Sequence, residues 1–224
     1  MAHTDGSSDL VTLLAQIAKA ATRAGSPAGK ALKRVRKMPA RAVQLSEICP
    51  LPDEIDQLYR NFDGVQAEKA KLNQWQSNLF LDFDFWTSGE LFFANRGSRR
   101  RDYKPRRQSV VVSSSIMQLG LNLAVGSEHP DAPSGVYASR YPMHERDYLA
   151  FDTVEGWLRT SLDAWEEGAM TIGDKGRLTY DPAQIAAIAA RHNAAREYWD
   201  HLAAGDVDWG PSNLAEWEAV ERQG

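Results

Sequence analysis

The sequence predicts an α+β fold, with an antiparallel sheet in the middle of the chain and helices before and after it. Three observations predict this fold. The two end regions carry apolar residues at helical spacing, the middle carries short runs rich in β-branched and aromatic residues, and turn residues separate those runs. Consecutive strands of this kind pair as an antiparallel meander, and helices grouped outside a meander are typical of the α+β class.

The first helix is predicted over 9–24, with Ser8 as its N-cap. Its apolar residues recur at helical spacing, namely Leu10, Leu13, Leu14, Ile17, Ala18 and Ala21. Gly25-Ser26-Pro27 ends it. The chain from there to Arg41 is small and basic, so residues 1–45 are predicted to form a semi-independent, partly helical N-terminal arm.

A second helix is predicted to begin at Pro52, because proline suits the first helical position and the acidic residues that follow complement the positive end of the helix. Its apolar face consists of Ile55, Leu58, Tyr59 and Phe62. Asp63-Gly64 is predicted to end it. The polar segment 65–77 is compatible with either a short helix or a loop.

The sheet is predicted from 79 onward. Residues 79–86 alternate with period two, and Glu90–Asn95 follows Ser88-Gly89 as the expected hairpin partner. The later strand candidates are Val110–Val112 with Ile116, Gln118–Gly126, Gly135–Tyr141 and Asp147–Phe151.

The last third is predicted to be helical. Asp152 opens an amphipathic helix that carries Val154, Trp157, Leu158, Leu162 and Trp165. Asp181-Pro182 starts a second helix, whose spacing continues to Ala204-Gly205, and Ser212 caps a short final one. The predicted division is therefore an arm at 1–45, an α+β domain at 46–170 and a helical extension at 171–224.

The composition is that of an ordinary globular protein. Of 224 residues, 43% are hydrophobic and 25% charged, and no apolar run approaches the roughly 18 residues of a membrane helix. The N-terminus lacks a secretory pattern, so we expect a cytoplasmic protein without membrane partners. Cys49 is the single cysteine, which excludes an internal disulfide, and it is expected to pack in the interior.

The net charge of −4 hides an asymmetry between the two halves of the chain. Residues 1–107 hold 18 Lys and Arg against 12 Asp and Glu, whereas 108–224 hold 8 against 18. Such a charge dipole can steer a charged partner toward one end of the molecule.

The clearest candidate contact region is a basic segment between two predicted strands. It contains Arg96, Arg99, Arg100, Arg101, Tyr103, Lys104, Arg106 and Arg107. Arginine forks with an aromatic ring could hold phosphates and stack a base, as nucleic-acid sites do. Alternatively, the segment is a solvated hairpin tip whose charges meet an acidic partner, because no nucleic-acid-binding motif accompanies it and the whole chain is acidic.

No catalytic, cofactor or metal motif is found. There is no HExxH, GxSxG, P-loop or GxGxxG, and the paired carboxylates are neighbours only along the sequence. His129 with Glu128 and Asp131 lacks further metal ligands at familiar spacing. The prediction is a non-enzymatic protein without a cofactor or a metal.

Seven tryptophans suggest binding surface as well as core. Trp157 and Trp165 lie on one predicted helical face and are expected to be interior. Some of the others are expected to be partly exposed, where aromatic side chains anchor partners, although all of them could pack the C-terminal helices onto the sheet. Trp86 is the tryptophan that we expect to act as an anchor.

The middle of the chain resembles the SUKH superfamily, which includes the Smi/Knr cell-wall regulators and bacterial immunity proteins. The matching pieces, which span about residues 45–168, are Leu51-Pro52, the run from Tyr59 to Gly64, Gly135-Val136-Tyr137, the run from Asp147 to Asp152, and Trp157-Leu158. The resemblance implies a non-enzymatic α+β module, and many bacterial members are antidotes that bind polymorphic toxins. The basic segment 96–107 departs from the family pattern, which suggests a partner surface specific to this chain.

The sequence therefore predicts an immunity-type protein that binds and neutralises a toxin. Arg99, Arg100, Arg101, Tyr103 and Arg106 would form its charged rim and Trp86 its anchor, while the acidic C-terminal half could mask a basic toxin. The alternative is a nucleic-acid-associated regulator or structural protein that uses the basic arm together with the Arg-rich segment.

Overall fold

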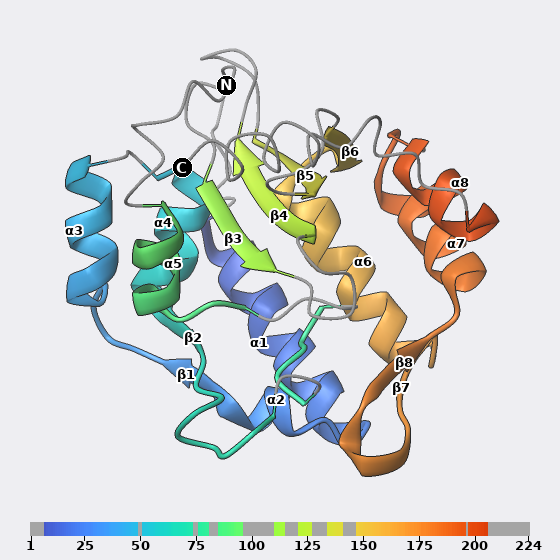
Figure 1. Cartoon of the computed structure of the whole chain (residues 1–224), viewed down its shortest axis with the longest axis horizontal. Coiled ribbons are helices and arrows are strands. Elements are labelled where there is room, and N and C mark those ends of the chain that lie inside the picture. Colours follow the sequence, from blue (N-terminus) through green and yellow to red (C-terminus); the bar gives the residue numbers. More distant parts are fainter. Residues whose placement is uncertain are drawn as a thin grey trace, which may run out of the picture.

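A four-stranded antiparallel sheet lies at the centre of the computed structural model, between two groups of helices (Figure 1). The structure describes residues 7–48, 51–73, 76–80, 85–95, 110–114, 121–126, 134–140, 147–195 and 197–205. Within these residues the α+β prediction is confirmed.

The central sheet is a meander, as predicted. Its strands are β3 (Val110–Ser114), β4 (Leu121–Gly126), β5 (Gly135–Arg140) and β6 (Asp147–Phe151), and each pairs antiparallel with the next. Consecutive residues 123–126 of β4 and 135–138 of β5 are all buried. The two middle strands are thus covered on both faces, which explains their runs of apolar residues.

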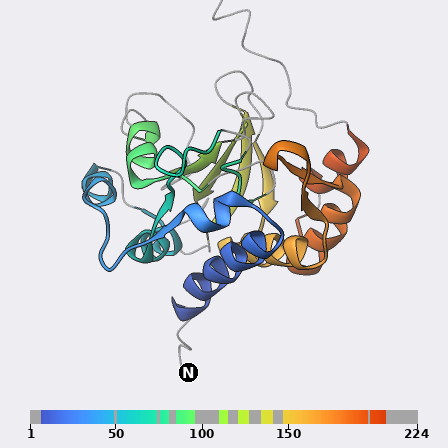
Figure 2. The ribbon, with the colours of Figure 1, turned by 90° about the horizontal axis from the view of Figure 1, so that it is seen from below.

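Helices α1 (Ser7–Arg23) and α6 (Val154–Glu166) pack against each other on one face of the sheet (Figure 2). Leu14 and Ile17 of α1 are completely buried, in the same hydrophobic cluster as Phe151 and Trp157. The predicted boundaries at residues 45 and 170 stay a prediction, but the packing of α1 makes it part of the common core.

The turn after α1 forms where Gly25-Ser26-Pro27 predicted it. Gly25 has a φ of +91°, its N–H donates to Thr22 O at 3.1 Å, and the Ser26 N–H donates to Ala21 O at 2.8 Å. This is the Schellman arrangement of a helix C-terminus. The chain continues into α2 (Pro27–Ala31) and β1 (Leu32–Arg34), a strand that the sequence analysis missed.

A second group of helices lies beside β3 and consists of α3 (Ala40–Ile48), α4 (Asp53–Asn61) and α5 (Ser88–Asn95). Helix α4 confirms the helix predicted from Pro52, although Pro52 is its N-cap. The helix ends at Asn61, two residues before the predicted Asp63-Gly64 stop, because β2 (Phe62–Val65) begins there and pairs with β1. Val65 ends β2, and the rest of the described part of segment 65–77 is a loop with a turn at 67–71.

The prediction of a strand at 90–95 is wrong, because these residues form the helix α5. Thr87 and Glu90 make a capping box: the Thr87 N–H donates to Glu90 Oε2 at 2.7 Å, and the Glu90 N–H donates to Thr87 Oγ1 at 3.3 Å. The strand predicted at 79–86 is described only at its two ends, so its middle lies outside the described residues, as do Cys49 and Ser212.

The C-terminal part differs from the prediction in two helix boundaries. Thr153, not Asp152, caps α6, since its hydroxyl accepts the Gly156 N–H at 3.0 Å. The helix predicted from Asp181-Pro182 begins there as α7 (Pro182–His192), but it breaks and restarts as α8 (Glu197–Ala204). The Asp152 carboxylate explains the break, because it accepts the N–H groups of Ala194 and Ala195.

A hairpin of β7 (Met170–Ile172) and β8 (Leu178–Tyr180) joins α6 to α7 and was not predicted. Helix α8 packs against β6, and α7 packs against α8 and α6, so this part lies at the opposite edge of the sheet from α5. No helix in the described segments combines the length and the apolar character that crossing a membrane requires.

Candidate functional site

Trp86 is the one predicted contact residue that the structure describes. Arg99, Arg100, Arg101, Tyr103 and Arg106 lie outside the described residues. Trp86 is half-buried and lies immediately before α5. Trp86 and the elements that hold it are therefore the described part of the predicted contact surface.

The backbone of Trp86 is fixed by two residues of the run from Tyr59 to Gly64. The Tyr59 hydroxyl donates to Trp86 O at 2.7 Å. Gly64 has a φ of +64°, and a Cβ built at this position would lie 2.2 Å from Trp86 O. Only glycine combines this backbone conformation with so close an approach.

Asp63 holds the start of α5. Its Oδ1 accepts the Ser88 N–H at 3.0 Å, and its Oδ2 accepts from Lys33 Nζ at 3.2 Å. The Asp63 side chain is only 13% exposed, so its carboxylate is better shielded from water than the other carboxylates that form ion pairs among the described residues. Together with the capping box, these contacts fix the position and the direction of α5.

Helix α5 turns one face inward and leaves an aromatic side chain outside. Leu91 is fully buried and Asn95 is 3% exposed. Phe93 points away from them and is 55% exposed. Among the residues that the structure describes, only Phe93 and Val43 are large apolar side chains that stand exposed.

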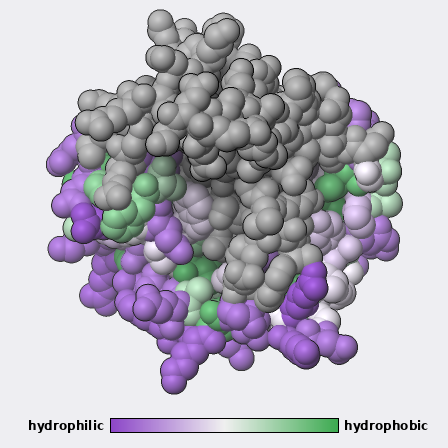
Figure 3. Space-filling view, viewed as in Figure 1, coloured by the Kyte–Doolittle hydropathy of each residue, from purple (hydrophilic) through white to green (hydrophobic). Residues whose placement is uncertain are grey.

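Phe92 borders Phe93, and Arg41 lies over the ring of Phe92. The rings of Phe92 and Phe93 lie 5.8 Å apart, edge to face, and the guanidinium of Arg41 on α3 lies 5.1 Å from the centroid of the Phe92 ring. Arg41 Nη1 also donates to Gln44 Oε1 at 2.8 Å. We call Arg41, Phe92 and Phe93 the α5 face; the space-filling view shows an apolar area over α5 with hydrophilic residues beside it (Figure 3).

Val43 does not extend the α5 face. It lies on α3 two residues after Arg41, and successive residues of a helix point in directions 100° apart. Arg41 and Val43 therefore point to nearly opposite sides of α3. The buried side chains of this helix, Ala42 and Leu45, lie between them.

The segment that leads to α3 is basic and largely unneutralised. Between Asp9 and Glu47 the sequence has no acidic residue. Arg23 pairs with Glu166 at 3.1 Å and Lys33 with Asp63. The described residues provide no acidic partner for the six other cations of the segment, which are all exposed: Lys19, Lys30, Arg34, Arg36, Lys37 and Arg41.

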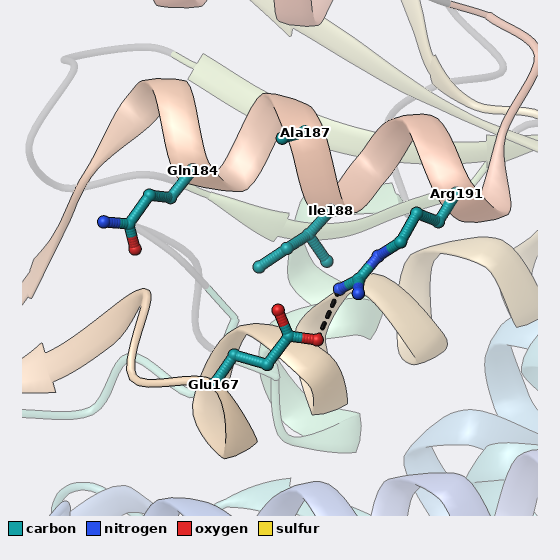
Figure 4. A pocket seen from close by; sticks show the side chains of 5 residues that line it. All are labelled: Glu167, Gln184, Ala187, Ile188 and Arg191. Atoms are coloured by element: carbon teal, nitrogen blue, oxygen red, sulfur yellow. Dashed lines mark hydrogen bonds and ion pairs between the residues drawn. The ribbon is translucent and has the colours of Figure 1, made fainter.

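A separate pocket lies between the end of α6 and α7 (Figure 4). It has a volume of about 310 Å³ and is lined by Glu167, Gln184, Ala187, Ile188 and Arg191. Arg191 Nη2 donates to Glu167 Oε1 at 2.6 Å, so the two charged groups of the pocket neutralise each other. The pocket is open to solvent and offers no unpaired charge to a ligand.

Several charged residues of the described surface form structural pairs. His192 Nε2 lies 2.8 Å from Asp163 Oδ2 and links α7 to α6. The hydrogen bond and the attraction of Asp56 raise the pKa of Arg60, which keeps that guanidinium charged. Within the described part of the chain, no group of three or more His, Cys, Asp or Glu side chains could hold a metal ion.

Arg41, Phe92 and Phe93 were not predicted from the sequence as contact residues. The run Leu91-Phe92-Phe93-Ala94 suggested a strand, in which alternate residues share a face. The available signal was Thr87-Ser88-Gly89-Glu90, a Thr-x-x-Glu pattern directly before an apolar run, which is typical of a helix N-terminus.

No protein-family model matches the chain, and no curated protein is significantly similar to it. The SUKH resemblance therefore stays a prediction that rests on the motif residues alone.

Proposed function

We propose that this chain is a non-enzymatic, cytoplasmic protein-binding module of the immunity type, which binds a toxin and neutralises it through the α5 face. The observation that carries the proposal is Phe93, which is 55% exposed on a helix that Asp63, Thr87 and Glu90 hold in place. A large apolar side chain exposed to water costs free energy that a partner's pocket would recover.

The rigid support of the α5 face favours binding. Phe93 has few rotatable bonds, and its helix is capped and tied to β2, so little conformational entropy is lost when a partner covers it. The toxin-neutralising role rests on the SUKH resemblance of Leu51-Pro52 and the run from Tyr59 to Gly64. Residues of this run hold Trp86 and α5, which connects the motif to the proposed contact surface.

The alternative function is nucleic-acid association through the basic arm and the Arg-rich segment 96–107. It is favoured by the exposed cations Lys19, Lys30, Arg36 and Lys37, for which the described residues offer no acidic partner. Such a protein would lose affinity steeply as the salt concentration rises, because binding releases counterions from the phosphates.

The test is capture with the tagged full chain in its own host, with and without nuclease, followed by identification of the captured protein. We expect one stoichiometric protein that survives nuclease. Expressed alone, it should arrest growth, and co-expression of this chain should restore growth.

Phe93→Ala should abolish both capture and protection, whereas Val43→Ala, which removes an exposed apolar side chain from another face, should leave both unchanged. A captured protein that is harmless when expressed alone contradicts the immunity role. Loss of all captured material on nuclease treatment would contradict the immunity role and favour the nucleic-acid alternative.

A further inference from the structure

We infer that the α5 face recognises an acidic protein surface with an apolar pocket, in which Phe93 enters the pocket while Arg36, Lys37 and Arg41 meet the surrounding carboxylates. The inference rests on the proposed function and names the partner chemistry of the same face. Arg41 is the cation of the α5 face, and Arg36 and Lys37 precede it in the segment that runs from β1 into α3, the helix that packs along α5.

The position of that segment is set by contacts at both of its ends. The Val35 N–H donates to Asn61 O at 2.9 Å, beside the start of β2, and the Val43 N–H donates to Pro39 O at 3.1 Å in the first turn of α3. Arg36 and Lys37 lie between these two contacts and are exposed. The segment runs below α3 on the same side of the molecule as α5 (Figure 1).

The charge of this region is positive and available to a partner. Arg36 and Lys37 meet no acidic side chain among the described residues. Asp63 is engaged by Lys33 and Ser88, and Glu90 by Thr87, while Glu47 lies near the C-terminal end of α3, six residues after Arg41. Arg41 stacks on Phe92, which holds its guanidinium at the edge of the apolar area. A planar guanidinium that is fixed in this way is suited to a carboxylate.

The shape of the face favours protein over single-stranded nucleic acid. Sites for single strands combine a groove with several aromatic platforms on which successive bases stack. Here one ring projects from the outer side of a helix, and its neighbour Phe92 is half-buried and covered by Arg41. A single projecting aromatic beside cations fits a pocket with an acidic rim.

The experiment uses the full chain and fluorescence anisotropy of three labelled probes at low salt: a short peptide of Glu and Leu, the same peptide with Lys in place of Glu, and a single-stranded oligothymidine. We expect the Glu-Leu peptide to bind most tightly. Phe93→Ala should weaken it by at least about tenfold, as for an interface hot spot.

Two matched double variants distinguish the effect of the charges near the α5 face from the effect of the protein's net charge. Arg36→Glu with Lys37→Glu should weaken the acidic peptide by about tenfold, whereas Lys19→Glu with Lys30→Glu, which changes the net charge equally, should change it little. Raised salt should reduce the difference between the two variants. Circular dichroism and thermal unfolding should show that all variants remain folded.

The inference is overturned if the Lys-Leu peptide or the oligothymidine binds more tightly than the Glu-Leu peptide, or if the two double variants behave alike. Its failure differs from that of the proposed function. If growth protection needs Phe93 but tolerates the charge reversal at Arg36 and Lys37, the proposed function stands and the inference about an acidic partner fails. If Phe93 is needed for binding of the acidic peptide but the chain gives no growth protection, the inference stands and the proposed function fails.

Discussion

Gly64 lies where α4, β2 and the segment leading into α5 meet. Its φ of +64° belongs to the left-handed region, and the backbone of Trp86 and Thr87 occupies the place of a Cβ. The residue thus serves two purposes: it lies where the register of the β1–β2 pair is irregular, and it lets the α5 segment approach β2 closely.

Replacing Gly64 by alanine should therefore destabilise the protein by at least about 3 kcal/mol, because the strained φ and the overlap with Trp86 add. Urea unfolding measures the loss. Gly25→Ala is the matched control: Gly25 has a φ of +91° but no atom within 4 Å of its Cβ position, so only the conformational cost of about 1 kcal/mol remains. Equal losses in the two variants would contradict the close approach.

The two tryptophans of α6 are buried because they lie on the face of the helix that packs against the core. Trp157 and Trp165 were predicted to be interior, and both are buried. Trp165 Nε1 donates to Leu79 O at 3.0 Å, which ties α6 to the chain before α5. Trp157 packs against Phe80, with ring centroids 4.6 Å apart. The helical spacing of these two tryptophans predicted that they are buried, but it did not predict their contacts with Leu79 and Phe80.

At the scale of elements, α5 is where a local pattern and the structure disagreed. Its apolar run suited a strand, but the capping box and the Asp63–Ser88 contact supply partners for the N–H groups that a helix start leaves open. After α7, by contrast, the helix ends where the local pattern suggested that it would continue. Its spacing continues past His192, but Asp152, distant in sequence, binds the N–H groups that an unbroken helix would use.

Thr87→Ala should cost about 1 kcal/mol, since it removes the N-cap side chain of α5. It should also weaken partner capture, because the orientation of Phe93 depends on this helix. Thr153→Ala, which removes the N-cap of α6, should cost a similar amount. Thermal unfolding and capture are measured in parallel, and α5 is not the contact element if both variants lower capture equally.

At the scale of the whole molecule, one hydrophobic cluster joins the N-terminal helix to the sheet and the C-terminal helices. Helix α1 contributes Leu13, Leu14 and Ile17 to this cluster, and it packs along α6. Most of the stability of an amphipathic helix in a protein comes from the packing of its apolar face, so α1 owes its stability to the core.

Leu14→Ala should destabilise the entire protein by about 2–5 kcal/mol, since it opens a cavity in the common core. Thr12→Ala, on the exposed side of the same helix, should change stability by no more than about 0.5 kcal/mol. Near-UV circular dichroism and tryptophan fluorescence should report a single transition for both variants. A separate early transition of α1 would instead restore a semi-independent arm.

The sequence by itself determined the fold class, the meander and the apolar faces of α1, α4 and α6, because these depend on periodicities of neighbouring residues. Only the tertiary structure decided that Glu90–Asn95 is a helix with Phe93 outside, that the chain breaks after His192, and that α1 belongs to the core. These outcomes depend on contacts such as Asp63 with Ser88 and Asp152 with Ala194, whose partners lie 25 and 42 residues apart. Local periodicity carries no information about which distant residues will meet.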